Sequence, residues 1–432
     1  MKKKFLIFFI FAILFLEIHV SLAITKPKYL PNANFSYSVW IPYWARWGGV
    51  DELLATNTSN GLVYNSNFNS NNTNSSFFGA TTSKMNIDKI DIISPFTFEV
   101  DGTGAFLDKG KMNQDAFDTL IKIAQAKKIK IYPTVLWGNA EQMSKVLADK
   151  DLQQAILSDI EYYLNKYNLD GIDIDFEGKK SSTKDNFSSL LKLVSTSLHK
   201  KNKGMICTIE ARTPLVDNYL KLTKKTITNV EFANDYSVIG KYCDQVRIMA
   251  YDQMGSDMSL NNQNKNTYYR PVADINWVER VIKNTITYGI PANKIVLGVA
   301  TYGYKFEVST STATTTNINT PDKYGSILLN NQSKYSYSRI GSINYSFADQ
   351  LAKSLNINPT RNNGGELEFS YSSTTDISNS TPGVLKTYYV EYSDSKAIEQ
   401  KISLAKKYKL AGISIFKIDG NNDHNIWNII KR

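Results

Sequence analysis

Short apolar segments alternate with longer amphipathic segments along most of this chain. Several short segments are continuous apolar runs, as expected for parallel strands that helices cover. We expect eight strands, at residues 38–44, 90–98, 129–137, 171–176, 205–210, 245–251, 294–301 and 411–416. We expect helices at residues 115–127, 152–167, 187–200, 278–288 and 396–408. This alternation predicts the α/β fold class, as one TIM (β/α)8 barrel.

Two segments interrupt the alternation. Residues 56–84 are rich in Asn, Ser and Thr, and they predict a flexible surface loop. Residues 305–392 begin with a low-complexity stretch, followed by a short helical pattern near 347–355 and β-rich runs at 366–372 and 384–392. We expect a small α+β insertion between strands 7 and 8 that forms one wall of a cleft. The predicted barrel therefore covers residues 36–304 and 393–432, and the insertion covers residues 305–392.

The first 23 residues have the pattern of a secretory signal peptide. Three lysines precede an apolar run from Phe5 to Leu16, and Ser21, Leu22 and Ala23 give a small-x-small cleavage site. An uncleaved N-terminal anchor is the alternative, although the run is short for a membrane span. We expect a secreted, cell-envelope or periplasmic protein with no membrane contact beyond the signal peptide.

Composition limits the partners and cofactors that we expect. The formal charge is +10, but there is no arginine-rich run or nucleic-acid motif, so we expect no nucleic-acid partner. The three histidines show no zinc-site spacing, so we expect no metal and no cofactor. One bridge between Cys207 and Cys243 is geometrically possible, and two free thiols are equally compatible with the sequence. We expect a monomer.

Residues 170–177, DGIDIDFE, carry the most informative polar pattern. Asp173, Asp175 and Glu177 alternate with apolar residues, so on a strand all three carboxylates share one face. Burying three acids is costly unless they share protons or find donors. An edge strand with a solvated acidic face is one reading. A calcium loop is a second, but its twelfth position, Lys184, lacks the required Glu. A catalytic strand whose last acid emerges at a barrel mouth is the third.

The octapeptide resembles the D-G-x-D-x-D-x-E signature of glycoside hydrolase family 18, the chitinases and their relatives, at every fixed position. Residues 246–252 are similar to the sixth strand of the family with its M-x-Y-D motif, and residues 294–304 look like its seventh strand. The run from residue 388 to residue 415 resembles bacterial, cell-wall-lytic members. Two departures are Phe416, where the family usually has Trp, and VLWG at 135–138, which replaces S-x-G-G.

The resemblance implies roles for the three acids. Glu177 is the last acid of its strand and lies nearest the mouth, about 6.6 Å above Asp175. Crowded carboxylates cannot all ionise, which suits Glu177 to act as general acid. By resemblance, Asp175 orients the acetamido group of the substrate and stabilises the cyclic intermediate, and Asp173 shares its proton.

The sixth strand supplies the next group of residues. By resemblance, Tyr251 donates a hydrogen bond to the acetamido oxygen, Met249 lines the same pocket and Asp252 contacts the sugar. Arg247, Met249 and Tyr251 alternate on one strand face. We hypothesise that Arg247 is a counter-ion for Asp173; its side chain pointing elsewhere is the alternative.

Aromatic residues at predicted strand ends are candidates for stacking on sugar rings. They are Trp44, Trp47, Phe96, Phe98, Trp137 and Phe416, with Phe416 placed at the floor of the sugar subsite by resemblance. Glu99 and Glu210 also lie near strand ends, where they either contact substrate or remain on the surface.

We therefore expect an exported glycosidase that hydrolyses β-1,4 linkages of N-acetylglucosamine polymers by substrate-assisted, retaining catalysis. Its expected partner is a polysaccharide of the chitin or peptidoglycan type; the core of N-glycans, and endo or exo action, remain open. The alternative is a weakly active or inactive chitinase-like lectin. Such proteins typically lack the terminal Glu, whereas Glu177 is present here.

Overall fold

The computed structural model describes residues 27–42, 86–214, 231–310, 334–418 and 425–431, without residues 32, 111, 113, 114 and 377. The predicted signal peptide at 1–23, the predicted loop at 56–84 and the candidates Trp44 and Trp47 lie outside these residues. The low-complexity start of the insertion is described only as far as residue 310.

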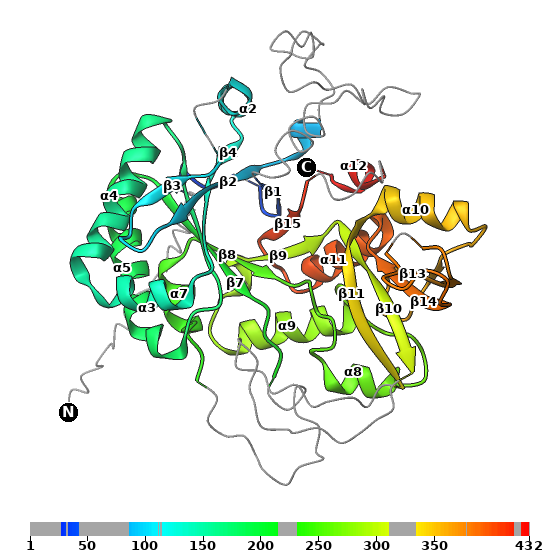
Figure 1. Cartoon of the computed structure of the whole chain (residues 1–432). Coiled ribbons are helices and arrows are strands. Elements are labelled where there is room, and N and C mark those ends of the chain that lie inside the picture. The colour runs from blue at the N-terminus through cyan, green and yellow to red at the C-terminus, as the bar shows by residue number, and fades with distance from the viewer. Residues whose placement is uncertain are drawn as a thin grey trace, which may run out of the picture.

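A closed parallel barrel forms the centre of the described structure (Figure 1). The first strand, β1, pairs with both β2 and β15, which closes the ring. Going round the ring, the barrel strands are β1 (Ser36–Ile41), β2 (Ile92–Val100), β4 (Lys130–Ile131) with β5 (Thr134–Trp137), β6 (Gly171–Phe176), β7 (Gly204–Glu210), β8 (Gln245–Met249), β9 (Ile295–Ala300) and β15 (Gly412–Phe416). The third strand of the barrel is divided into β4 and β5 around Pro133, which has no N–H to donate to a neighbouring strand. The prediction of a TIM barrel is confirmed.

Helices surround the barrel strands (Figure 1). The five predicted helices are α2 (Asp115–Ala126), α4 (Lys150–Lys166), α5 (Lys184–Lys200), α9 (Ile275–Thr287) and α11 (Ser395–Lys407). Asp149, Asp274 and Asp394 cap α4, α9 and α11 by accepting backbone N–H donors of the first turn, which fixes where these helices begin. Within the described residues, no helix has the length and apolar content to cross a membrane.

Short elements complete the barrel domain. The short α-helices are α3 (Ala140–Ala148), α7 (Tyr236–Tyr242), α8 (Met258–Gln263) and α12 (Ile426–Ile429). The 3-10 turns are η3 (Asn86–Lys89), η4 (Ser181–Thr183) and η5 (Ala292–Lys294), and the short strand β3 (Phe106–Asp108) runs antiparallel to the end of β2. None of these was predicted from the sequence, and most of them have too few residues to show a clear period.

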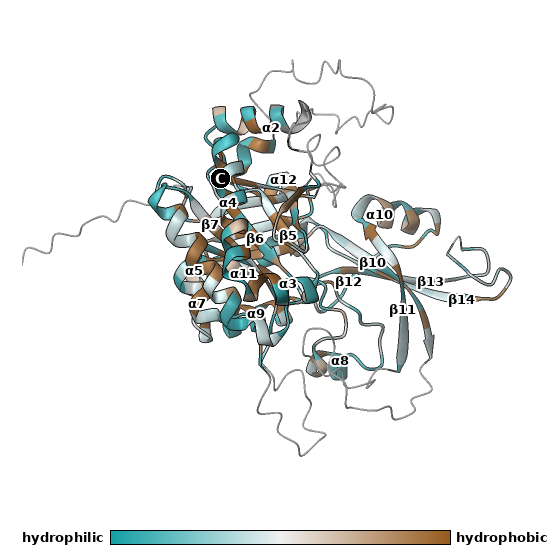
Figure 2. Ribbon diagram, turned by 60° about the vertical axis from the view of Figure 1, so that its left-hand side comes forward, coloured by the Kyte–Doolittle hydropathy of each residue, from teal (hydrophilic) through white to brown (hydrophobic). Residues whose placement is uncertain are grey.

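The insertion is an antiparallel sheet with one helix, and it stands to one side of the barrel (Figure 2). Its strand order is β11-β10-β14-β13-β12. The elements are β10 (Tyr302–Thr310), β11 (Tyr335–Asn344), α10 (Tyr345–Ser354), β12 (Thr360–Arg361), β13 (Leu367–Ser373) and β14 (Lys386–Tyr392). The predicted helix and two β-rich runs are present, whereas β10 and β11 were not predicted.

Polar contacts fasten the insertion to the barrel domain. The buried Glu366 carboxylate accepts the N–H groups of Val272 and Ala273 at 2.9 and 3.1 Å. Arg361 forms two charge-assisted hydrogen bonds with Asp394, at 2.9 and 2.6 Å, just before α11. Paired bonds of this kind fix geometry as well as adding energy. The insertion is therefore held in a defined position relative to the barrel mouth.

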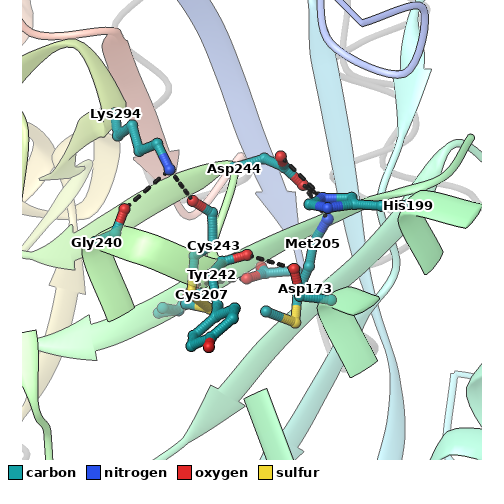
Figure 3. Close-up of a disulfide and its surroundings, with 11 residues drawn as sticks. Asp173, His199, Met205, Cys207, Gly240, Tyr242, Cys243, Asp244 and Lys294 are labelled. Atoms are coloured by element: carbon teal, nitrogen blue, oxygen red, sulfur yellow. Dashed lines mark hydrogen bonds and ion pairs between the residues drawn. A yellow bond between two sulfur atoms is a disulfide. The ribbon is translucent and has the colours of Figure 1, made fainter. Parts of the chain in front are cut away.

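A disulfide between Cys207 on β7 and Cys243 after α7 settles the question that the sequence left open (Figure 3). The two Cα atoms are 5.9 Å apart, and 36 residues separate the cysteines in the chain. Lys294 donates to the carbonyl groups of Gly240 and Cys243, at 2.9 Å each. The bridge links the outer face of β7 to the helix layer.

Candidate active site

Asp173 of β6 lies at the centre of a group of buried hydrogen-bond donors. Its Oδ2 accepts from Trp40 Nε1 at 3.0 Å and from the Thr134 hydroxyl at 2.9 Å. Arg247 Nη1 donates to the same oxygen at 2.9 Å, and the Thr208 hydroxyl donates to Oδ1 at 2.8 Å. Asp173 and Arg247 are both fully buried, so the cation compensates a carboxylate that water cannot reach. The hypothesis that Arg247 is the counter-ion of Asp173 is confirmed.

Asp175 lies two residues further along the same strand face, in a different environment. Its side chain is only 2% exposed, and in the described structure its Oδ1 has no hydrogen-bond partner. Burial, followed by the charges of Glu177, Asp173 and Glu210, raises the pKa of Asp175 well above its ordinary value, although Lys179 acts in the opposite direction. Burial and these negative charges therefore favour the protonated form of Asp175.

Glu177 follows the last residue of β6 and is partly exposed. Its N–H donates to the carbonyl of Trp137 at 2.8 Å, which keeps the backbone in the sheet direction. Gly178, with φ 65°, then turns the chain in a conformation that disfavours other residues. Because Asp173 and Asp175 are buried, Glu177 is the acid of this strand that a substrate at the barrel mouth can reach.

Tyr251 and Asp252 follow β8 at the same end of the barrel. Burial, then the charge of Asp175, raises the pKa of Tyr251 well above 10, so its phenol remains a hydrogen-bond donor. The exposed Asp252 accepts hydrogen bonds from the hydroxyl groups of Tyr302 and Tyr304, both at 2.7 Å. These two tyrosines belong to β10 of the insertion. They were not among the site residues predicted from the sequence, although their i, i+2 spacing on one strand was the available signal.

Aromatic rings surround Phe416 at the end of β15. The Tyr251 ring stacks on Phe416 with a centroid distance of 5.3 Å, and Trp40, Phe96 and Tyr302 approach it to 6.0, 6.1 and 6.0 Å. Phe416 is partly exposed, and the peptide bond that follows it is cis. The structure thus brings the candidates Phe96 and Phe416 next to Tyr251. It also adds Trp40, which our sequence analysis did not select.

The comparison with protein families decides which class of protein has this arrangement. The model of "Glycosyl hydrolases family 18" matches residues 39–421, most of the chain. The chain belongs to glycosyl hydrolase family 18. It is therefore a chitinase-like glycoside hydrolase, and the resemblance of its motifs to this family is confirmed.

A protein of known sequence and two solved structures resemble this chain over most of its length. YvbX of Bacillus subtilis (strain 168), described as an uncharacterized glycosylase, is 24% identical over 338 residues, which cover 76% of this chain and 82% of YvbX. The spore cortex-lytic enzyme SleL of Bacillus cereus superposes with a TM-score of 0.59 at 17% identity, covering 92% of this chain and 73% of SleL. A family 18 chitinase of Cycas revoluta, in complex with (GlcNAc)4, gives a TM-score of 0.60 at 12% identity, covering 91% of this chain and 98% of the chitinase.

Trp137 lies apart from the other candidate residues of this family 18 site. It is in register with Phe176, on the opposite face of the sheet from Asp175, and the two rings meet edge to face at 5.2 Å. Its side chain is 3% exposed, and its Nε1 donates to Gln142 of α3 at 3.5 Å. This position corrects the expectation that Trp137 stacks on a sugar, because the ring packs beneath a helix.

Glu210 joins the family 18 site, although no motif identified it. Its carboxylate accepts from Gly178 N–H at 2.9 Å and from Asn234 Nδ2 at 2.7 Å, and it lies 3.9 Å from Lys179 Nζ. Burial acts to raise the pKa of Glu210, but Lys179 and these hydrogen bonds lower it below its ordinary value. Met249 is in register with Glu210 on the neighbouring strand and is partly buried. Across the described residues, no cluster of three His, Cys, Asp or Glu side chains could hold a metal ion.

Proposed function

We propose that this glycosidase hydrolyses β-1,4 linkages in N-acetylglucosamine polymers of the chitin or peptidoglycan type, with substrate assistance and retention of configuration. The different surroundings of the three acids along β6 carry this proposal. Asp173 is paired with the Arg247 cation, the surroundings of Asp175 favour its protonated form, and Glu177 follows the strand where it is partly exposed. The three acids thus differ in charge and in access to substrate, as a stepwise proton transfer requires.

In the first step, Glu177 donates its proton to the glycosidic oxygen as the bond from that oxygen to C1 breaks. The carbonyl oxygen of the N-acetyl group of the same sugar forms a bond to C1, which gives a positively charged cyclic intermediate. Asp175 orients the acetamido group and stabilises this charge, while Asp173 shares the proton of Asp175. Tyr251 donates a hydrogen bond to the acetamido oxygen, a role that fits its raised pKa.

In the second step, water attacks C1 and transfers a proton to the Glu177 carboxylate. The bond between C1 and the acetamido oxygen breaks, which restores the N-acetyl group. Two successive inversions at C1 retain its configuration. Around this reaction, Met249 lines the acetamido pocket, Asp252 contacts the sugar, and Phe416 with Phe96 supplies the aromatic floor of the subsite.

Two observations support the choice of polymer and of compartment. The related Cycas chitinase was solved with an N-acetylglucosamine oligomer, and SleL is a spore cortex-lytic enzyme. The disulfide between Cys207 and Cys243 fits an oxidising compartment, in agreement with the signal-peptide pattern of residues 1–23. We therefore propose that the mature chain acts outside the cytoplasm.

Glu177→Gln tests this proposed function. The substitution removes the transferable proton and keeps the size of the side chain, so hydrolysis should fall by about a hundredfold to ten-thousandfold while oligomer binding persists. The wild-type protein, Glu177→Gln and the control Glu161→Gln are incubated with chitin oligomers and with peptidoglycan, and products are weighed by mass spectrometry. Glu161 is a good control because it lies on α4, paired with Lys201. Binding without hydrolysis by the wild type would favour the lectin alternative.

A further inference from the structure

The peptide bonds on both sides of Glu177 are fixed by hydrogen bonds to different strands. On the β5 side, Glu177 N–H donates to the carbonyl of Trp137 at 2.8 Å. On the β7 side, Gly178 N–H donates to Glu210 Oε1 at 2.9 Å. The second bond lies beyond the end of β6, where sheet pairing no longer holds the backbone. Glu210 therefore limits how far the backbone of Glu177 can rotate.

Glu210 is itself held from three directions. Its place on β7 is in register with Met249 of β8. Asn234 Nδ2 donates to Oε2 at 2.7 Å, and Lys179 Nζ lies 3.9 Å from Oε1. The Lys179 side chain is 1% exposed, lies 4.7 Å over the Phe187 ring and donates to the carbonyl of Phe176. A partly buried ion pair thus links the turn that follows Glu177 to β7.

The charge of Glu210 also acts on Asp175. The charged and titratable groups that act on Asp175 come from three barrel strands and the turn after β6. They are Asp173 and Glu177 with β6, Glu210 on β7, Arg247 and Tyr251 with β8, and Lys179 in the turn. Among these, the negative charge of Glu210 favours the protonated form of Asp175, and Lys179 opposes it.

We propose that Glu210, braced by Lys179 and Asn234, is a positioning residue that fixes the backbone of the general acid and supplies part of the negative charge around Asp175. This inference rests on the proposed function, because positioning is defined relative to that reaction. The carboxylate has two separable effects. Its oxygen orients Gly178 N–H, and its charge acts through space on the pair of Asp175 and Glu177.

Two substitutions separate these effects. Glu210→Gln keeps an oxygen for Gly178 N–H but removes the charge. Asn234 can accommodate the new glutamine, because within the described structure the Oδ1 atom of Asn234 has no hydrogen-bond partner. If the Asn234 amide rotates by half a turn, this oxygen can accept a hydrogen bond from the glutamine amide. Glu210→Ala removes both the acceptor and the charge. Glu161→Gln is the matched control, because Glu161 is 23% exposed against 25% for Glu210 and is also paired with a lysine.

The first measurement follows kcat, KM and the pH profile of each variant. Glu210→Ala should lower kcat about tenfold to a hundredfold with a smaller change in KM, because the acid is misplaced. Glu210→Gln should recover most of kcat but should keep the alkaline limb of the kcat/KM profile shifted to lower pH, because a neighbouring negative charge is gone. Values of kcat for Glu210→Ala within twofold of Glu161→Gln would overturn the proposal. So would an unshifted alkaline limb in Glu210→Gln, which decides the matter even if Glu210→Ala does not fold.

The second measurement is independent of activity. Hydrogen–deuterium exchange of the peptide that contains Gly178 should be faster in Glu210→Ala than in the wild type, and unchanged in Glu161→Gln and Glu210→Gln. Equal protection in Glu210→Ala and the wild type would show that Glu210 does not hold this turn, and would overturn the proposal. A wild-type protein that cleaves no polymer would contradict the proposed function, while the exchange data would still decide whether Glu210 fixes the turn.

Discussion

Asp173 and Asp175 are two residues apart on one strand face, yet they differ in their hydrogen-bond partners and in the charges near them. Asp173 accepts four hydrogen bonds, one of them from Arg247, and such donors stabilise an anion. Asp175 has an unpaired buried oxygen and three acidic neighbours, and its pKa is raised. Three acids on one strand are tolerated because Asp173 is paired with a cation, the protonated form of Asp175 is favoured, and Glu177 is partly exposed.

The raised pKa of Asp175 predicts a pH-dependent cost to stability. Between the ordinary carboxyl pKa near ~4 and the raised folded-state value, the folded chain retains a proton that the unfolded chain releases. The stability due to this group is therefore present at low pH and is lost as the pH rises through that window. Asp175→Asn is neutral at all these pH values. The difference in melting temperature, Asp175→Asn minus wild type, should become more positive as the pH rises above about 4.

Asp159→Asn is a suitable control for this experiment, because Asp159 on α4 accepts a backbone N–H from Phe106 at 2.8 Å, away from the acids of β6. The three proteins are melted in matched buffers at each pH. Subtracting the melting temperatures then removes the pH dependence that all the other titrating groups contribute. A constant difference between Asp175→Asn and the wild type across this range would mean that Asp175 is ionised in the folded chain.

The residues of the site differ in how far the sequence revealed them. The pairing of Asp173 with Arg247 could be hypothesised because strict alternation fixes which side chains enter a barrel. Trp137 could not be placed in the same way. It ends a run of three apolar residues, 135–137, so polarity does not show which of them face inward. Pro133 interrupts the strand, so the alternation of residues 129–132 cannot be extended to Trp137. Glu210 was named as a candidate, but its role stayed open between substrate contact and the surface, because a single acid at a strand end matches no motif.

At the scale of elements, burial determines what the sequence could predict. The barrel strands and long helices were predicted because strands covered by helices are continuously apolar and helices of this length show a clear period. The insertion strands β10 and β11 have partly exposed faces, and β11 has the polar composition YSYSRIGSIN. β10 nevertheless carries Tyr302 and Tyr304, which hold Asp252. An element that is hard to predict thus contributes to the site.

The disulfide joins β7 to Cys243, the residue after α7, and should contribute measurably to stability. Closing a loop of this size lowers the conformational entropy of the unfolded chain, which raises the free energy of unfolding by about 3–4 kcal/mol. We expect the double substitution Cys207→Ala and Cys243→Ala to lower the free energy of unfolding by about 3 kcal/mol, as measured by urea denaturation. Adding a reducing agent should destabilise the wild type to a similar extent and leave the double variant unchanged. A wild type that is insensitive to the reducing agent would indicate that the bridge does not form.

At the scale of the whole molecule, the site draws side chains from segments that are distant in sequence. Trp40 comes from β1, the acids from β6, Glu210 from β7, and Tyr251 follows β8. The insertion adds Tyr302 and Tyr304, and β15 adds Phe416 near the C-terminal end. Only closure of the barrel brings β1 beside β15, so these groups meet in the folded molecule alone. Catalytic activity is therefore expected only when the barrel and the insertion are both correctly assembled.

The assembled site predicts hydrolysis with retention and a dependence on the acetamido group. If the neighbouring carbonyl attacks C1, a de-N-acetylated sugar in the position just before the cleaved bond cannot react. A thiazoline mimic of the cyclic intermediate should inhibit, because the site is complementary to that charged, strained species. Tyr251→Phe should weaken both hydrolysis and thiazoline binding by about 1–3 kcal/mol, the value of one hydrogen bond to a charged group. NMR of the first-formed product decides the stereochemistry. Release of the α-anomer from a β-linked substrate, or equal rates on the deacetylated sugar, would exclude this mechanism.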